Sequence, residues 1–334
     1  MKVGVLMGGP SSEHEVSLAT GQNVLEGLDR SKYEPVAVKI VKSGQWFLNP
    51  APNLSADRQQ KGRVWCGAGG KPTTPEQVFK SCDVVFNALH GYYGEDGKIQ
   101  ALLDYNKVRY TGSGVASSAI AMDKFHSREL FKLAGFNVPK TLKLLKGENY
   151  SARLQFFINK IIRLPVVVKP CSNGSSVGVA IVEEASGLNK AVFAAFKLDK
   201  EVLVEEFIKG RELTCGVLDS IGALPVTEII PVKSHKFFNY QAKYKTGHAN
   251  ELTPAPLDDI LYKKAQDLAV RAHQILGCRG YSRTDMILKN GNGTIYVLET
   301  NTLPGLTKNS LLPKAAAVAG LSFSQLLDHI ISNS

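Results

Sequence analysis

The chain has 334 residues, of which 44% are hydrophobic and 21% charged, and its formal net charge is +10 at pH 7. This length predicts two or three domains and a sizeable core. No apolar run approaches the roughly 18 residues of a membrane span, and no signal peptide precedes the first predicted strand. The five cysteines show no C-x-x-C spacing, which favours reduced thiols over a zinc site. We therefore expect a cytoplasmic protein without membrane contact.

The basic residues are spread along the chain, and no helix or tail gathers them. Their densest stretch, residues 233–248, also carries four aromatic side chains and could stack the bases of a single-stranded nucleic acid. One loop is a small footprint for such a ligand. The charge is better matched to an anionic small molecule, and we expect no nucleic-acid partner.

The first third of the chain alternates short apolar strands with helical stripes. Strands are predicted at 2–7, 34–41 and 83–88, and helical periodicity follows the first and the third of them. This pattern predicts a parallel α/β domain. Gly8 and Gly9 close the first strand, at the edge where such sheets bind ligands.

The middle of the chain is predicted to be a small α+β segment. Residues 49–76, rich in Pro, Gly and polar side chains, are expected to form an irregular insertion before it, and residues 111–114 (TGSG) a linker. The expected elements are a helix at 123–135, a strand after Pro139, a hairpin over 166–184, a helix at 186–197 and a strand at 201–208.

From Arg211 onward the chain is predicted to be rich in strands. One long helix carries apolar residues from Leu261 to Ile275 and ends at Gly277, a residue type that suits the position after a helix. Residues 281–301 are predicted to form a hairpin with an NGNG turn, and two helices close the chain.

The sequence VVVKPCSNGSSVGV at residues 166–179 runs from an apolar strand through Lys169 into a Gly/Ser loop. Backbone N–H groups of such a loop can turn toward an anion, and the lysine adds positive charge, which predicts a flap over phosphate. Gly174 to Gly178 also matches the G-x-S-x-G elbow of esterases, but an elbow needs a helix after the turn. Residues 177–184 indicate a second strand instead. An ordinary hairpin with a polar loop is the third interpretation.

The predicted 281–301 hairpin carries a candidate metal site. Asp285 and Glu299 lie on facing strands, and Asn301 shares the face of Glu299 because side chains in a strand alternate. Three converging oxygen ligands suit Mg²⁺ bridged by substrate phosphates, although a solvated polar sheet face would show the same pattern. Arg283 shares the face of Asp285, where it could balance the carboxylates or stabilise negative charge in a transition state.

The register of this hairpin decides whether the two carboxylates meet. A symmetric turn at Gly291 and Asn292 would pair Asp285 with Leu298 and send Glu299 to the opposite face. We therefore predict an odd-length loop or a bulge, for which the NGNG turn supplies glycines.

Two lysines (Lys124 and Lys169), a Gly/Ser flap and a carboxylate–carboxylate–amide cluster together describe a nucleotide site. The sequence contains no G-x-x-x-x-G-K-[ST], so this is not a P-loop. Residues 112–117 (GSGVAS) fall short of G-x-G-x-x-G, which disfavours dinucleotide binding.

Nine short stretches, in order along nearly the whole chain, resemble the D-alanine–D-alanine ligase family of the ATP-grasp superfamily. Each stretch is weak alone, but nine collinear matches are highly specific. They are GGPSSEHEVSL (8–18), ALHGYYGEDGKIQ (88–100), YTGSG (110–114), MDK (122–124), VVKPCSNGSSVGV (167–179), VEEFIKGRE (204–212), AKY (242–244), RTD (283–285) and ETNTLPGLTKNSL (299–311).

The resemblance implies an ATP site and two divalent ions, Mg²⁺ or Mn²⁺. It assigns phosphate binding to Lys124, Lys169 and Lys243, the adenine pocket to Glu205, Phe207 and Ile208, the ribose hydroxyls to Glu212, and metal binding to Asp285, Glu299 and Asn301.

The resemblance also implies sites for two D-alanine substrates. Alone, Glu13 is a first-turn helix carboxylate, and a histidine that ends a strand, such as His90, is more often structural. The resemblance assigns Glu13 to the ammonium of the first D-alanine, with Ser175 and Tyr244 in the same hydrogen-bonded network and His90 nearby. It assigns Arg283 and the Gly305 N–H to the oxyanion. It assigns Ser310 and the Leu311 N–H to the carboxylate of the second substrate.

The resemblance implies a ligase that joins two D-alanines through an acyl phosphate for peptidoglycan precursor synthesis. D-Ala–D-Ser and D-Ala–D-lactate ligases, and a non-catalytic nucleotide-binding relative, are the alternatives, and Tyr244 argues for an amine as the second substrate. The implied fold is an ATP-grasp fold, α/β and α+β, behind an N-terminal parallel α/β domain. We expect domains at 1–112, 113–205 and 206–334 and a homodimer. Residues 233–252 are predicted to form a closing lid.

Overall fold

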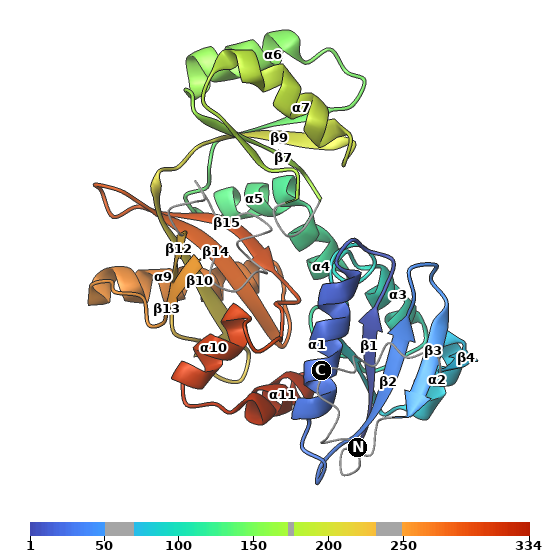
Figure 1. The fold of residues 1–334 in the computed structure, drawn as a ribbon. Helices are drawn as coiled ribbons and strands as arrows, with labels where there is room; N and C mark the ends of the chain where they lie inside the picture. Colours follow the sequence, from blue (N-terminus) through green and yellow to red (C-terminus); the bar gives the residue numbers. More distant parts are fainter. Residues whose placement is uncertain (51–69, 173–176, 232–248) are drawn as a thin grey trace.

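The computed structural model describes residues 1–50, 70–172, 177–231 and 249–334, and these residues form three β-sheets with helices packed against them (Figure 1). The expected hairpin around the Gly/Ser flap is present on both sides of residues 173–176, which lie outside the described residues. Of the expected lid at 233–252, residues 233–248 also lie outside them, and the described end at 249–252 is a paired strand rather than the expected loop.

The first sheet is the predicted parallel α/β domain with an antiparallel extension. Its strands are ordered β4-β3-β2-β1-β5, and β1 runs parallel to both β2 and β5. Its elements are β1 (Lys2–Gly8), α1 (His14–Gly27), β2 (Glu34–Ile40), β3 (Trp46–Pro50), β4 (Lys71–Thr73), α2 (Pro75–Ser81), β5 (Val84–Asn87) and α3 (Lys98–Tyr105).

The expectation of an irregular insertion at 49–76 is wrong at both ends of this range, which are the parts of it that the structure describes. Strand β3 runs to Pro50, and β4 pairs with it. Helix α2 begins at Pro75 because Thr74 and Gln77 form a capping box before it. Strand β4 has three residues, none of them buried, so it leaves no alternating pattern in the sequence.

The second sheet is antiparallel, in the order β6-β9-β7-β8, and helices α6 and α7 cover one face of it (Figure 1). The helix at 151–161 was not predicted from the sequence. The elements are β6 (Thr141–Leu145), α6 (Ser151–Phe156) with a π-helical turn (Phe157–Ile161), β7 (Val166–Pro170), β8 (Ala180–Val182), α7 (Leu188–Phe196) and β9 (Glu201–Glu206).

The third sheet follows the path β13-β12-β10-β14-β15, with β11 beside β10. Helices α4, α5 and α9 share its apolar core, whereas α10 and α11 belong to the core of the first sheet. The elements are α4 (Val115–Met122), α5 (Lys124–Leu133), β10 (Gly210–Leu218), β11 (Gly222–Ala223), β12 (Thr227–Pro231), β13 (Ala249–Leu252), α9 (Asp259–Ile275), β14 (Tyr281–Lys289), β15 (Ile295–Asn301), α10 (Leu311–Val318) and α11 (Phe323–Ser332).

The β14–β15 hairpin contains the predicted bulge. Asp285 pairs with Glu299, Met286 pairs with Val297, and Leu298 is the extra residue between them. The NGNG turn itself keeps the symmetric register, so the expectation that its glycines supply the correction is wrong. The reason is packing: Val297 must face the core beside Met286, so the extra residue can enter only after it.

Among the described residues, no single helix is long and apolar enough to cross a membrane. Helices α10 and α11 have the length and apolar composition of a membrane span only when taken together, and the pair is bent by 105° at the break between them.

Candidate active site

A cavity of about 570 Å³ opens where strands of the second and third sheets, helices α1 and α5 and the loop after β5 converge. Every predicted site residue that the structure describes lines it, whereas Ser175, Lys243 and Tyr244 lie outside the described residues. The predicted residues in its wall are Glu13, His90, Lys124, Lys169, Glu205, Phe207, Ile208, Glu212, Arg283, Asp285, Glu299, Asn301, Gly305, Ser310 and Leu311.

Three buried charges form a cluster in the wall of the cavity. Glu205 of β9 accepts a hydrogen bond from Arg128 of α5 at Oε1, and its Oε2 lies 3.0 Å from the Lys169 Nζ of β7. Burial, and then the charge of Arg128, lowers the pKa of Lys169 to about 8. Burial acts to raise the pKa of Glu205, but Arg128 and Lys169 outweigh it and lower that pKa. Glu205 is therefore held as a carboxylate.

Apolar side chains continue the wall beside this cluster. Phe207 and Ile208 follow β9, and Met286 and Leu298 come from the hairpin that carries the bulge. A pocket with apolar walls and a few convergent polar groups is typical of a small-molecule binding site.

The hairpin brings the oxygen atoms of Asp285, Glu299 and Asn301 to the cavity wall. Asp285 Oδ1 accepts hydrogen bonds from Thr214 Oγ1 at 2.6 Å and from Arg283 Nε at 2.9 Å, while Oδ2 accepts from Arg283 Nη2 at 3.0 Å. Glu299 lies opposite Asp285, with its Oε2 3.7 Å from Lys124 Nζ. Hard oxygen donors on one face would suit Mg²⁺, and in this structure Arg283 occupies both oxygens of the Asp285 carboxylate.

In another part of the wall, the loop before α1 meets the loop after β5, where Ser11 Oγ donates to the His90 carbonyl at 2.7 Å. Glu13 is buried, and a Cβ on Gly91 would lie 2.6 Å from its Oε2. His90 forms a hydrogen bond through Nε2 with Thr20 Oγ1 at 2.8 Å, and its Nδ1 lies 3.9 Å from Glu95 Oε1. Only a residue without a side chain fits position 91, which also has φ +66°.

The N-terminus of α10 forms the remaining wall. Ser310 is the residue before this helix, and its Oγ accepts a hydrogen bond from Thr307 N at 3.0 Å. A Cβ on Gly305 would lie 2.9 Å from the same Oγ, so the loop passes close to the helix start. Backbone N–H groups at a helix start bind carboxylates and phosphates readily.

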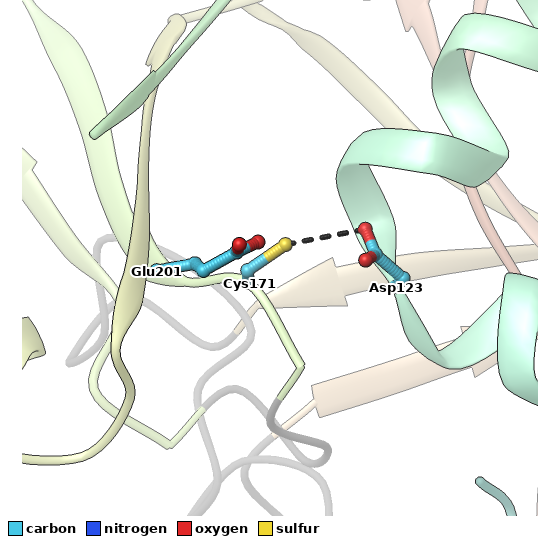
Figure 2. Close-up of side chains that lie close together, drawn as sticks. All are labelled: Asp123, Cys171 and Glu201. Carbon is cyan, nitrogen blue, oxygen red and sulfur yellow. Dashed lines mark hydrogen bonds between the residues drawn. The ribbon is translucent and has the colours of Figure 1, made fainter. Parts of the chain in front are cut away.

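Asp123, Cys171 and Glu201 form a second cluster beside α5, with their ligand atoms within 4.8 Å of one another (Figure 2). Cys171 Sγ donates to Asp123 Oδ1 at 3.3 Å, and burial raises the pKa of its thiol to about 12. Asp123 also caps α5, and Glu201 pairs with Lys143 at 3.2 Å. Because the thiol is protonated and both carboxylates already have partners, we interpret this cluster as a structural contact between α5 and the second sheet rather than as a metal site.

Three other residues of this region were not predicted from the sequence. Arg128 and Glu95 line the cavity, and Thr214 orients Asp285. A signal existed for Arg128, which lies four residues after Lys124 and therefore on the same face of α5. Glu95 and Thr214 lie in ordinary polar contexts that mark no site.

Family models match both parts of the chain: the D-ala D-ala ligase N-terminus over residues 2–113 and the D-ala D-ala ligase C-terminus over residues 130–332. The chain belongs to the D-alanine–D-alanine ligase family. The D-alanine–D-alanine ligase of Syntrophobacter fumaroxidans is 42% identical to it, over 99% of this chain and 96% of that protein.

Two solved structures are similar to that of this D-alanine–D-alanine ligase family member. The VanG D-Ala:D-Ser ligase of Enterococcus faecalis has a TM-score of 0.83 at 32% identity, over 99% of this chain and 98% of that one. The D-alanine–D-alanine ligase of Bacillus anthracis complexed with ATP has a TM-score of 0.78 at 33% identity, over 100% of this chain and 97% of that one. The predicted ATP-grasp fold is confirmed.

Proposed function

We propose that this chain uses ATP to join two D-alanines into D-alanyl-D-alanine, a building block for peptidoglycan precursors. The observation that carries the proposal is that one cavity is lined by all the predicted groups that the structure describes. These groups are two lysines, a buried carboxylate cluster, Glu13 and the start of α10. Full-length likeness to D-alanine–D-alanine ligases supports it. The enzyme is then an ADP-forming ligase.

The nucleotide occupies the end of the cavity formed by the second and third sheets. Lys124 and Lys169 bind its phosphates, because both ammonium groups line the wall near Glu299. Adenine lies against Phe207 and Ile208 beside the Glu205 carboxylate, and Glu212 binds the ribose hydroxyls. The resemblance assigns Lys243 to the transferred phosphate, and that residue lies outside the described chain.

Asp285, Glu299 and Asn301 would hold two Mg²⁺ or Mn²⁺ ions. The donor set fits such ions, since it consists of oxygen atoms from two carboxylates and an amide. Bound there, such an ion would offset negative charge on the ATP phosphates.

The first D-alanine binds at the Glu13 end, with its ammonium on the Glu13 carboxylate and His90 beside it. Its carboxylate oxygen attacks the γ-phosphorus of ATP, which forms an acyl phosphate and releases ADP. This step is needed because a carboxylate oxygen is a poor leaving group. Ser175 and Tyr244, which the family places in the same network, lie outside the described residues.

The second D-alanine binds through its carboxylate at Ser310 and the Leu311 N–H. Its amine attacks the carbonyl carbon of the acyl phosphate, and the tetrahedral oxyanion is stabilised by Arg283 and the Gly305 N–H. Collapse of this intermediate expels inorganic phosphate, and the nitrogen loses a proton. The pairing of Arg283 with Asp285 keeps its guanidinium oriented before the oxyanion forms.

A D-Ala–D-Ser ligase is the second candidate, because the related VanG structure bears that name. One experiment separates the candidates: release of ADP measured with D-alanine alone and with D-serine, D-lactate or L-alanine as the second substrate. We expect turnover with D-alanine alone and formation of its dipeptide. A product formed only with D-serine or D-lactate would reject the main proposal. ATP binding without any amino-acid-dependent ADP release would identify a non-catalytic relative.

We further propose that the chain forms a homodimer with domains at 1–112, 113–205 and 206–334. Helices α4 and α5 belong to the middle segment by sequence, although they share the core of the third sheet. Sedimentation of the purified protein tests the dimer, and a monomer at micromolar concentration would contradict it.

A further inference from the structure

Arg128 stands out because nothing in the reaction described above uses it. Its side chain is only 2% exposed, and it lines the cavity from the face of α5 that also carries Lys124. The guanidinium joins two elements far apart in the chain: Nη1 donates to Glu205 Oε1, and Nε donates to the Leu298 carbonyl at 2.8 Å. Leu298 is the extra residue of the β15 bulge.

Stability does not explain this third buried charge. Without Arg128, Lys169 and Glu205 would form an electrically neutral pair at 3.0 Å. Buried ion pairs are weak sources of stability, and adding another desolvated charge is costly unless it does something else. Moreover, Arg128 Nη2 has no hydrogen-bond partner among the described residues. A buried donor of this kind is expected to find an acceptor when the cavity fills.

We propose that Arg128 is a positioning residue for nucleotide specificity, which fixes Glu205 as the acceptor for the amino group of adenine. The inference rests on the proposed function, in which the ring lies beside Glu205. Arg128 engages one carboxylate oxygen and Lys169 the other, so the carboxylate cannot rotate away from the cavity. Its second anchor at Leu298 fixes the guanidinium relative to the apolar wall.

The chemistry favours adenine over hypoxanthine. An ionised carboxylate only accepts hydrogen bonds, and the adjacent Arg128 and Lys169 only donate them. This pattern complements the amino group and ring nitrogen of adenine. Hypoxanthine has a carbonyl oxygen in place of the amino group, so two acceptors would face each other at Glu205. A site built to hydrogen-bond one group strongly rejects the analogue that lacks it.

The test compares ATP with ITP in Arg128→Lys, Arg128→Met and the control Arg271→Met. Arg271 also donates to a backbone carbonyl, that of Ala134, but it lies outside the cavity lining. Dissociation constants are measured by calorimetry without D-alanine, and kcat and KM are measured with it. In both Arg128 variants we expect the preference for ATP over ITP to fall at least about tenfold. The KM for D-alanine should stay within about threefold, and Arg271→Met should match wild type.

The lysine variant keeps the positive charge but cannot reach both Glu205 and Leu298 with one ammonium. If it keeps the full preference for ATP, or if both nucleotides weaken by the same factor, the proposal is wrong. If neither variant folds, Arg128 is a structural residue and the proposal is rejected. Failure of the proposed function can be told apart from failure of this proposal. If the wild-type protein shows no D-alanine-dependent ADP release, its dissociation constants for ATP and ITP still give the ratio that tests Arg128.

Discussion

Lys169 is buried at the end of β7, where its pKa is lowered to about 8. ATP phosphates would favour the charged form, so the free protein must be protonated at Lys169 to bind well. We expect ATP affinity to be constant below pH 8 and to fall above it, by up to about tenfold per pH unit. Calorimetry from pH 6.5 to 9.5 checks this. Lys169→Arg, which stays charged throughout, should remove the dependence, and an affinity that rises with pH would contradict the assignment.

Glu299 faces Asp285 across the bulged hairpin. Glu299→Gln removes one anionic oxygen, so we expect a weaker response to Mg²⁺ and turnover reduced at least about tenfold, with little change in Tm. The control is Glu228→Gln, which breaks the bidentate pair with Arg211 outside the cavity lining. It should lower Tm without changing Mg²⁺ dependence. Full activity of Glu299→Gln at low Mg²⁺ would remove Glu299 from the metal site.

Gly91 leaves room for the Glu13 carboxylate. A Cβ there would approach Glu13 Oε2 to 2.6 Å, whereas at Gly147, with a similarly positive φ, no described atom lies within 4 Å of the added Cβ. Both alanine variants carry backbone strain, but only Gly91→Ala displaces Glu13. We expect it to raise the KM for D-alanine severalfold and to leave the KM for ATP unchanged. Equal kinetic effects of the two variants would show that strain alone is responsible.

Helix α5 carries both Lys124 and Arg128, and its start is fixed by Asp123. The Asp123 side chain accepts hydrogen bonds from the N–H groups of Phe125 and His126, both at 3.0 Å. Asp123→Ala should lower the free energy of unfolding by about 1 kcal/mol in urea titrations, while Asp123→Asn, which still caps, should recover most of it. If Asn costs as much as Ala, the charge of Asp123 matters rather than the cap.

At the scale of the whole molecule, different parts of the fold supply the proposed ATP residues and the proposed residues for the first D-alanine. The proposed ATP residues lie on β7, β9 and β10, on α5 and in the loop after β9, whereas Glu13 and His90 lie in the loops that follow β1 and β5 of the first sheet. In hydrogen exchange, we expect a non-hydrolysable ATP analogue to protect β7 and β9, and D-alanine to be required for protection at the start of α1. The π-helical turn at Phe157–Ile161, away from the cavity lining, serves as the control. Equal protection of α1 by the nucleotide alone would contradict this division.

The sequence by itself determined most of the local structure of this protein. Short apolar runs predicted the parallel strands of the α/β sheet, and strand parity alone required an irregularity between Asp285 and Glu299. These inferences hold because the period of a strand and the caps of a helix depend on neighbours in sequence. Helix α6 and strand β4 were missed because short, largely exposed elements leave little hydrophobic period.

Only the tertiary structure decided how distant residues meet. Val297 had to pack beside Met286, which moved the bulge from the glycine turn to Leu298. The same packing brought Arg128 to Glu205, 77 positions later in the chain, and to the carbonyl of that bulge. No local pattern encodes such contacts, because they depend on how helix α5 and two separate sheets pack. The sequence therefore specified which groups the site has, and the packing of the sheets specified which of them act together.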